Sequence, residues 1–133
     1  MLTQLGHIRD GELFFPAGDA VISAVDARDL AEVAVAEIVA DVAVGGTLIL
    51  TGPEPTTLHE IAERLGRAVS LPLALRDDVA PDWPEYYALG MRRLFDSYRA
   101  RGFAPRTHMI EEVLGQLPRS IEQFAKEVLQ PAL

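Results

Sequence analysis

The sequence predicts an α/β fold, in which a small parallel sheet built around one βαβ unit is accompanied by several helices. Residues 45–75 read in order as a strand, a turn, a helix and a second strand. On both sides of this stretch, apolar side chains recur at spacings of three and four residues, as in amphipathic helices. The length of 133 residues and the hydrophobic fraction of 49% suit a soluble chain with its own core, so we expect residues 1–133 to form a single domain.

Residues 47–50 are expected to form the first strand of the βαβ unit. They are apolar or β-branched, with two glycines before them and a glycine–proline pair shortly after. A short apolar run between such breakers favours a strand that is buried on both faces. A second strand is expected at residues 71–75, reached by a right-handed parallel crossover.

The helix of this unit begins at a capping box formed by Thr57 and Glu60. The threonine hydroxyl can accept the amide three residues later, while the glutamate reaches back to the amide of the cap. The apolar residues that follow lie on one stripe at helical spacing: Leu58, Ile61, Ala62, Leu65, Ala68 and Val69. This stripe is expected to lie against a sheet.

The region before the unit predicts two short strands and a helix. Residues 11–18 place three large apolar side chains between a glycine and a proline, and residues 21–25 form a second apolar run. The two are expected to pair as a hairpin across a turn at residues 17–19. Asp26 can cap a helix that continues to about residue 40. The apolar face of this helix consists of Leu30, Ala31, Ala34, Ile38 and Val39.

The region after the unit predicts three helices. Residues 85–101 carry large side chains at helical spacing, and Gly102 ends that helix: Tyr87, Met91, Leu94, Phe95 and Tyr98. A shorter helix is expected at residues 109–114, stopped by Gly115. Ser120 and Gln123 form a second capping box at the start of the last helix. That helix is expected to bury Ile121, Phe124, Ala125 and Val128.

Three segments resemble the NmrA-like branch of the atypical short-chain dehydrogenases. They are LTGPEPTTLHEIAERL at residues 50–65, PAGDAVISAVDARDLAEVA at 16–34 and LGQLPRSIEQFAKE at 114–127. The resemblance covers essentially the whole chain, although Leu114, Gln116, Leu117 and Ser70 depart from the family pattern. It implies the C-terminal, substrate-side half of a partial Rossmann-like fold. It also implies that the helix after Asp26 packs on a dinucleotide-binding sheet.

The cofactor-binding motif of that family is missing from this sequence. NAD(P) is implied by the resemblance, and its pyrophosphate would need a glycine-rich turn between a first strand and a first helix. Gly45 and Gly46 precede a strand instead of following one, which is the wrong context. We therefore expect no cofactor to bind this chain alone, and we interpret it as the half that lacks the glycine-rich turn.

No catalytic or metal-binding constellation is evident. The sequence has no cysteine, and His7, His59 and His108 are too far apart in sequence to form a metal-ligand motif. No tyrosine is followed four residues later by lysine, and no serine lies in a nucleophile elbow. Asp26 and Asp29 could act as paired carboxylates, but their place at a helix start favours capping and dipole stabilisation. We therefore predict no catalytic residue and no metal.

The aromatic residues are the most suggestive feature for binding. Tyr87, Phe95 and Tyr98 are at helical spacing, which favours packing. Trp83 and Tyr86 lie beside a proline-bounded loop and off that stripe, and Phe15 with Pro16 could face the same cleft. We predict a substrate or partner surface that consists of these four residues: Phe15, Pro16, Trp83 and Tyr86. In the family that the chain resembles, this helical region forms one wall of the substrate cleft.

The composition excludes some partners and leaves two functional hypotheses. A net charge of −8 without a basic run argues against nucleic acid, and no run of about 18 apolar residues predicts a membrane span. The absence of cysteine fits the cytoplasm. One hypothesis is the substrate-side part of an NAD(P)-dependent oxidoreductase, and the alternative is a non-catalytic binding or regulatory module. Because the predicted strands lack neighbours, we expect either a homodimer or association with a Rossmann half.

Overall fold

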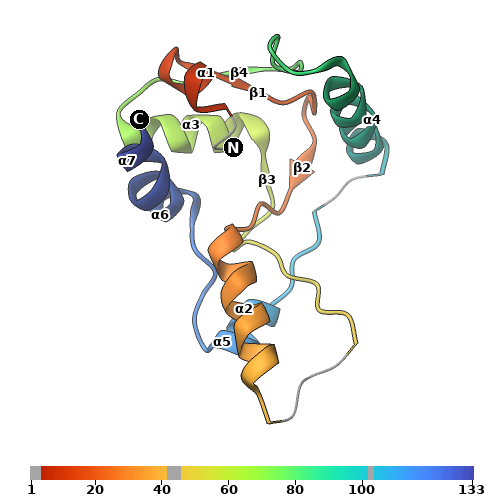
Figure 1. The fold of residues 1–133 in the computed structure, drawn as a ribbon, viewed down its shortest axis with the longest axis vertical. Coiled ribbons are helices and arrows are strands. Elements are labelled where there is room, and N and C mark those ends of the chain that lie inside the picture. The colour runs from red at the N-terminus through yellow and green to blue at the C-terminus, as the bar shows by residue number, and fades with distance from the viewer. Residues whose placement is uncertain (1–3, 42–45, 102–103) are drawn as a thin grey trace.

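A computed structural model of the chain describes residues 4–41, 46–101 and 104–133. It confirms the α/β class (Figure 1). The elements, in order, are α1 (Leu5–Arg9), β1 (Glu12–Phe14), β2 (Val21–Ile22), α2 (Ala27–Val39), β3 (Thr56–Thr57), α3 (Leu58–Val69), β4 (Ala74–Arg76), α4 (Glu85–Arg101), α5 (Met109–Leu114), α6 (Ile121–Phe124), a π-helical turn (Ala125–Leu129) and α7 (Gln130–Ala132). The last three form one continuous helical segment. Two residues named in the predictions lie outside the described residues: Gly45, at the start of the predicted βαβ unit, and Gly102, the predicted end of the helix at residues 85–101.

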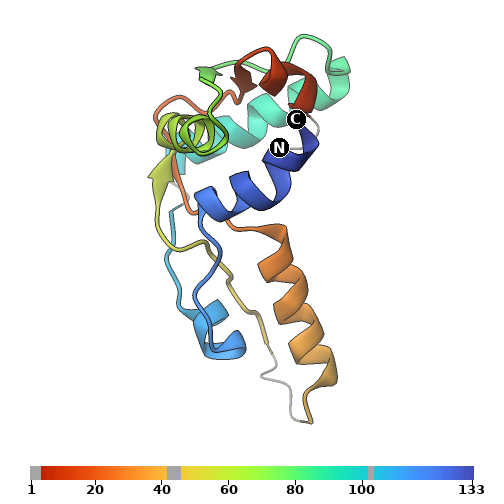
Figure 2. The same ribbon diagram turned by 90° about the vertical axis from the view of Figure 1, so that its left-hand side faces the viewer.

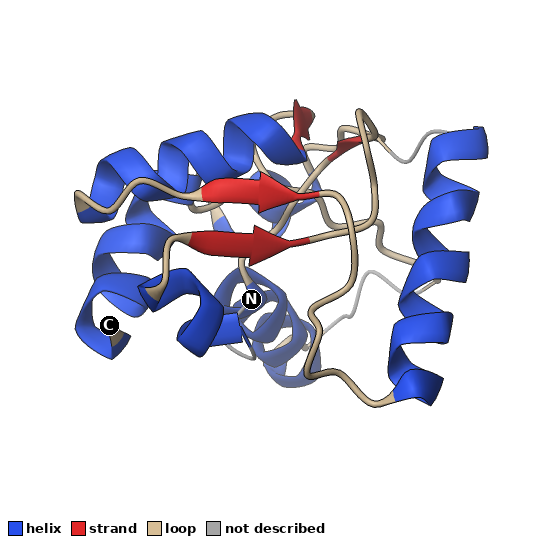
Figure 3. Ribbon diagram, turned by 90° about the horizontal axis from the view of Figure 1, so that it is seen from above, coloured by secondary structure: helices blue, strands red, loops and turns tan. Residues whose placement is uncertain are grey.

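The strands form two small sheets (Figure 3). β1 pairs in parallel with β4, placing Glu12 opposite Ala74, and β2 pairs antiparallel with β3, placing Val21 opposite Thr57. The small parallel sheet is confirmed, but the predicted hairpin between the first two strands is wrong. A tight turn that includes Gly18 at φ 54° follows β1. After this turn β2 pairs with β3 instead of with β1.

The outer edge of β1 is covered by a side chain. Gln4 is buried, its Nε2 donates a hydrogen bond of 2.8 Å to the carbonyl of Phe14, and the Phe14 amide donates one of 2.8 Å to Gln4 Oε1. The side-chain amide therefore occupies the place of a neighbouring strand. An edge satisfied in this way is a poorer template for pairing with another chain.

The helix of the predicted βαβ unit is confirmed, whereas its first strand is not. α3 begins with the capping box of Thr57 and Glu60 and buries Leu58, Ile61, Ala62 and Leu65. Residues 47–50 have no strand partner in the described part of the chain, and Ile49 is 55% exposed. The place beside β4 is taken by β1, from the start of the chain. Residues 47–50 instead contact a loop, where Thr107 Oγ1 donates to the Ile49 carbonyl at 2.6 Å.

α3 ends in a left-handed residue, which explains why the strand after it starts later than predicted. Ser70 has φ 56° and ψ 33°, and its amide donates to the carbonyls of Arg67 and Gly66. Residues 71–73 then pass close to Gly66, where an added Cβ would lie 2.7 Å from the carbonyl oxygen of Leu71. Only after this crossing does the chain enter β4.

We expect Ser70→Gly to stabilise the fold, because glycine adopts the left-handed conformation without a steric cost from Cβ. The gain should be about 1 kcal/mol, measured as a higher midpoint in urea denaturation followed by circular dichroism. Ser70→Ala keeps the Cβ and serves as the control, with no comparable gain. A lower midpoint for Ser70→Gly would contradict the assigned role of this residue.

α2 extends away from the rest of the molecule, with α5 beside it (Figures 1 and 2). Its predicted start is confirmed, since Asp26 accepts a hydrogen bond from the Arg28 amide at 2.9 Å. Val33 is buried, but the five residues of the predicted apolar face are all exposed: Leu30, Ala31, Ala34, Ile38 and Val39. Ile38 is 81% exposed. The helix therefore presents an apolar face that nothing in the described chain covers.

The core lies between α3, the β1–β4 sheet and the C-terminal helical segment. Its buried members are Ile8, Leu13, Ala17, Leu58, Ile61, Ala62, Leu65, Phe95, Ala125 and Leu129. The capping box of Ser120 and Gln123 at the start of α6 is confirmed, and the helix ranges predicted for α4 and α5 are confirmed to the residue. Among the described residues, no helix is long and apolar enough to cross a bilayer.

Candidate functional site

The four residues of the predicted aromatic surface have different surroundings in the structure. Trp83 is partly exposed and packs edge-to-face on Tyr87, with ring centroids 4.8 Å apart. Tyr86 points into solvent and is 91% exposed. Phe15 packs on Phe95 at 5.6 Å instead. Pro16 is buried beside it in the chain, so no ligand surface shared by all four residues is evident, and their role in binding stays a prediction.

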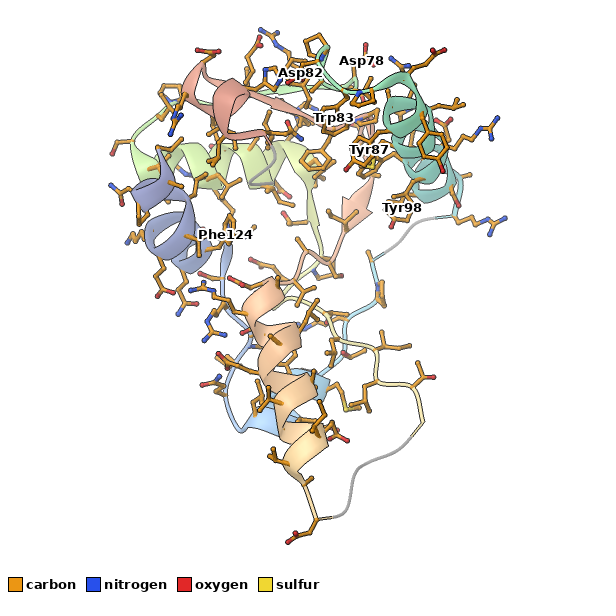
Figure 4. The ribbon with its side chains drawn as sticks, viewed as in Figure 1. Asp78, Asp82, Trp83, Tyr87, Tyr98 and Phe124 are labelled. Atoms are coloured by element: carbon orange, nitrogen blue, oxygen red, sulfur yellow. The ribbon has the colours of Figure 1, made fainter. Side chains whose placement is uncertain are left out.

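Phe95 and Tyr98 pack as the spacing predicts, but Tyr87 does not reach the core. Phe95 is buried, and Tyr98 packs edge-to-face on it at 5.4 Å. Tyr87 is 46% exposed and contributes one ring to the pair with Trp83. Figure 4 shows Trp83 and Tyr87 lying together beside α4. These two residues are therefore the exposed aromatic pair at this end of the molecule.

An ion pair and a histidine–carboxylate hydrogen bond hold the loop before Trp83 against its surroundings. Asp78 pairs with Arg92 at 2.9 Å, and Asp82 pairs with His7 at 2.8 Å. The hydrogen bond from Arg92 lowers the pKa of Asp78, and the one from His7 lowers the pKa of Asp82. Each contact ties the loop to a helix, α4 or α1, so the orientation of Trp83 depends on segments far apart in the sequence.

Asp26 and Asp29 have structural partners and are not arranged as an acid–base pair. Asp26 caps α2 and binds the Arg28 guanidinium, whose hydrogen bonds lower the pKa of Asp26. Asp29 is 1% exposed and accepts hydrogen bonds from the backbone amide of Arg119, at 2.8 Å, and from the guanidinium of that residue. Arg119 also binds Glu32 at 2.6 Å. Capping by Asp26 is thus confirmed, while the partner of Asp29 was not predicted.

The starts of the three longest described helices, α2, α3 and α4, disfavour a dinucleotide pyrophosphate. Such a site uses free backbone amides and the positive end of a helix. α2, α3 and α4 each carry a carboxylate in the first turn: Asp29, Glu60 and Glu85. At α3 the amides are also taken up by the capping box. Within residues 4–41, 46–101 and 104–133, no group of three or more histidines and carboxylates could hold a metal ion.

A cavity of about 410 Å³ opens between α2, α3 and α6. Its walls are mostly apolar: Ala24, Val25, Ala27, Ile61, Leu65, Ile121 and Phe124, with Asp26, Arg119 and Ser120 at the polar end. Arg64 on α3 holds α6 in place through Glu122 at 2.6 Å, and its hydrogen bonds lower the pKa of Glu122 to about 2. The sequence pattern predicted buried helix faces for Ile61, Leu65, Ile121 and Phe124 and a strand for residues 21–25, and it gave no signal of a cavity.

Two curated proteins resemble the chain in sequence. "Prestalk A differentiation protein A" of Dictyostelium discoideum is 27% identical over 129 residues, which cover 90% of this chain and 43% of that protein. The uncharacterized oxidoreductase YesF of Bacillus subtilis is 32% identical over 126 residues, covering 87% of this chain and 44% of that protein. No protein-family model matches the chain.

Solved structures share the fold at low sequence identity. The triphenylmethane reductase of a Citrobacter species superposes with a TM-score of 0.79 at 16% identity, covering 97% of this chain and 48% of that protein. The NADPH-dependent quinone oxidoreductase QOR2 of Escherichia coli gives 0.79 at 15% identity, covering 96% and 50%. Structures of both proteins are also known in complex with NADP(H) or NADPH.

Together the comparisons place the chain beside NmrA-like NAD(P)-dependent reductases. The structural likeness establishes the fold, and one of the two relatives by sequence is an uncharacterized oxidoreductase. The chain spans less than half the length of the curated relatives that it matches.

Proposed function

We propose that this chain is the substrate-side half of an NAD(P)H-dependent reductase and turns over no substrate by itself. The observation that carries the proposal is the exposed apolar face of α2, with Ile38 81% and Val35 58% exposed. Residues 47–50 have the composition of a buried strand and lie unpaired in the described chain. Both features are expected when the sheet that would cover these residues is formed by another polypeptide segment.

Burying the apolar face of α2 against a partner would contribute a large favourable free energy. Fully burying one valine, leucine or isoleucine side chain contributes about 1.5–3 kcal/mol, and four such residues lie on the exposed side of α2: Leu30, Val35, Ile38 and Val39. A nucleotide-binding half would cover them and supply the cofactor site. The Trp83 and Tyr86 region would then form part of the wall around the substrate.

We expect the isolated chain to show no saturable NADPH binding by calorimetry, because the starts of α2, α3 and α4 each carry a carboxylate that repels phosphate. Adding the half of the Bacillus subtilis relative that this chain does not match should restore binding in the mixture. Ile38→Asp should weaken this complementation, because it buries a charge in the joint surface. Leu117→Asp, at a residue that is 73% exposed off that face, should leave it unchanged. Micromolar binding at one site on the chain alone would overturn the proposal.

The second candidate is a regulatory module that acts by association with itself or a partner. It is favoured by the relative named for differentiation instead of for a reaction. The same apolar face of α2 would then join two copies, since closed twofold pairing is the commonest assembly. Light scattering tests the self-associating form of this hypothesis. A stable dimer that Ile38→Asp converts to a monomer supports it, and a monomer at every concentration tested contradicts it.

A further inference from the structure

The cavity between α2, α3 and α6 has the features of a small-molecule site. Ligand pockets in proteins commonly measure about 300–1,000 Å³ and combine apolar walls with a few polar groups. This one measures about 410 Å³. Ile61 and Leu65 of α3, which are 2% and 0% exposed, lie at its floor. Ile121 and Phe124 form its α6 wall, and the segment that leads into α2 forms a third side.

The polar groups of the cavity are already paired, which constrains the charge of a ligand. Asp26 is bound by the Arg28 guanidinium, with Nη2 to Oδ2 at 2.7 Å. Arg119 is bound by Asp29 and Glu32, and Ser120 accepts the Gln123 amide at 3.2 Å. A charged ligand would have to compete with these ion pairs or lose its own hydration without a partner. The site therefore favours a neutral molecule.

We propose that this cavity binds a neutral aromatic molecule of one or two rings. An apolar cavity of about 150 Å³ suffices for benzene, so the space here admits a second ring. The Phe124 ring offers an aromatic wall for edge-to-face or offset contact. In Figure 4 Phe124 lies at α6, on the other side of the molecule from Trp83 and Tyr87. None of the four residues of the predicted aromatic surface lines the cavity. The proposal is thus independent of the function proposed above and of any cofactor.

The isoleucines of the chain report on the cavity directly. With 13C-labelled isoleucine methyl groups and 2-naphthol as the probe, NMR should show saturable shifts of Ile61 and Ile121 at one probe per chain. Ile38 and Ile49 are exposed and lie outside the cavity, so their signals should stay in place. Shifts confined to Ile38 and Ile49, or no shift up to the solubility of the probe, would overturn the proposal.

A filling substitution tests the location. Ala27 lines the cavity and is exposed at the first residue of α2. Ala27→Phe should therefore fill the space and weaken binding by at least about tenfold. Ala31→Phe is the same change one turn further along the helix, outside the cavity, and should leave the affinity unchanged. Phe124→Leu removes the aromatic wall and should also weaken binding.

The signals of Ile8 and Ile110, both buried outside the cavity, verify that each variant is folded. Undiminished binding by folded Ala27→Phe and Phe124→Leu would place the probe elsewhere and refute the site.

Discussion

Gly52→Ala is expected to leave most of the chain unfolded under conditions where the unmodified protein is folded. A Cβ at this position would lie 1.8 Å from the carbonyl oxygen and 2.8 Å from the carbonyl carbon of Ala24. Both atoms belong to the backbone, so no side-chain rotation relieves the contact. The loop before α3 and the segment before α2 would have to separate, and Ala24 of the latter segment packs against the core and lines the cavity.

We expect the free energy of unfolding to fall by more than about 3 kcal/mol, the range of severe overpacking. Urea denaturation followed by circular dichroism measures it. Gly90→Ala is the matched control, because a Cβ there meets nothing within 4 Å and the residue lies inside α4. That change should stabilise the chain by up to about 1 kcal/mol. A Gly52→Ala protein with an unchanged midpoint would show that the close approach of the two segments is absent in solution.

Asp29→Ala is expected to destabilise the chain by about 3 kcal/mol. The carboxylate is 1% exposed and joins the first turn of α2 to the backbone amide and guanidinium of Arg119. Its removal leaves that amide without its acceptor and the guanidinium with only Glu32. The expected loss in the free energy of unfolding lies at the lower end of the range for a buried ion pair, because the Arg119 side chain is 24% exposed.

The same denaturation measurement tests the role of Asp29. Asp19→Ala removes an exposed carboxylate and should change stability by less than about 0.5 kcal/mol. Adding Arg119→Leu to Asp29→Ala should recover part of the loss, since the guanidinium that has lost its buried partner is then removed as well. A loss below about 1 kcal/mol for Asp29→Ala, within the range of an ordinary surface pair, would contradict a buried anchor at this position.

Local signals in the sequence predicted the helices well. Both capping boxes, the cap at Asp26 and the ranges of α4 and α5 depend on residues a few positions apart, and all are confirmed. A cap works through hydrogen bonds to the backbone two or three residues away. Such a contact forms in the same way wherever the helix comes to lie, so the sequence contains all the information that it needs.

Strand partners were predicted less well, because pairing is a contact between distant segments. Residues 47–50 have the composition of a buried strand, yet β1 pairs with β4 and leaves them to a loop around Thr107. The composition shows that these residues would be stable in a sheet without showing which segment lies next to them. A buried Gln4 at the edge of β1 illustrates the same limit, since nothing in the local pattern marks that side chain as a substitute strand.

By itself the sequence determined the class of fold, the helix starts and the resemblance to NmrA-like reductases, and these rest on local hydrogen bonds and on matched segments. Only the tertiary structure decided that α2 leaves its apolar face exposed, that Asp29 meets Arg119 90 residues away, and that an open cavity lies between α2, α3 and α6. Each of these features depends on which surfaces pack against each other and exclude water. Such contacts join distant elements, so the residue pattern within one element does not determine them.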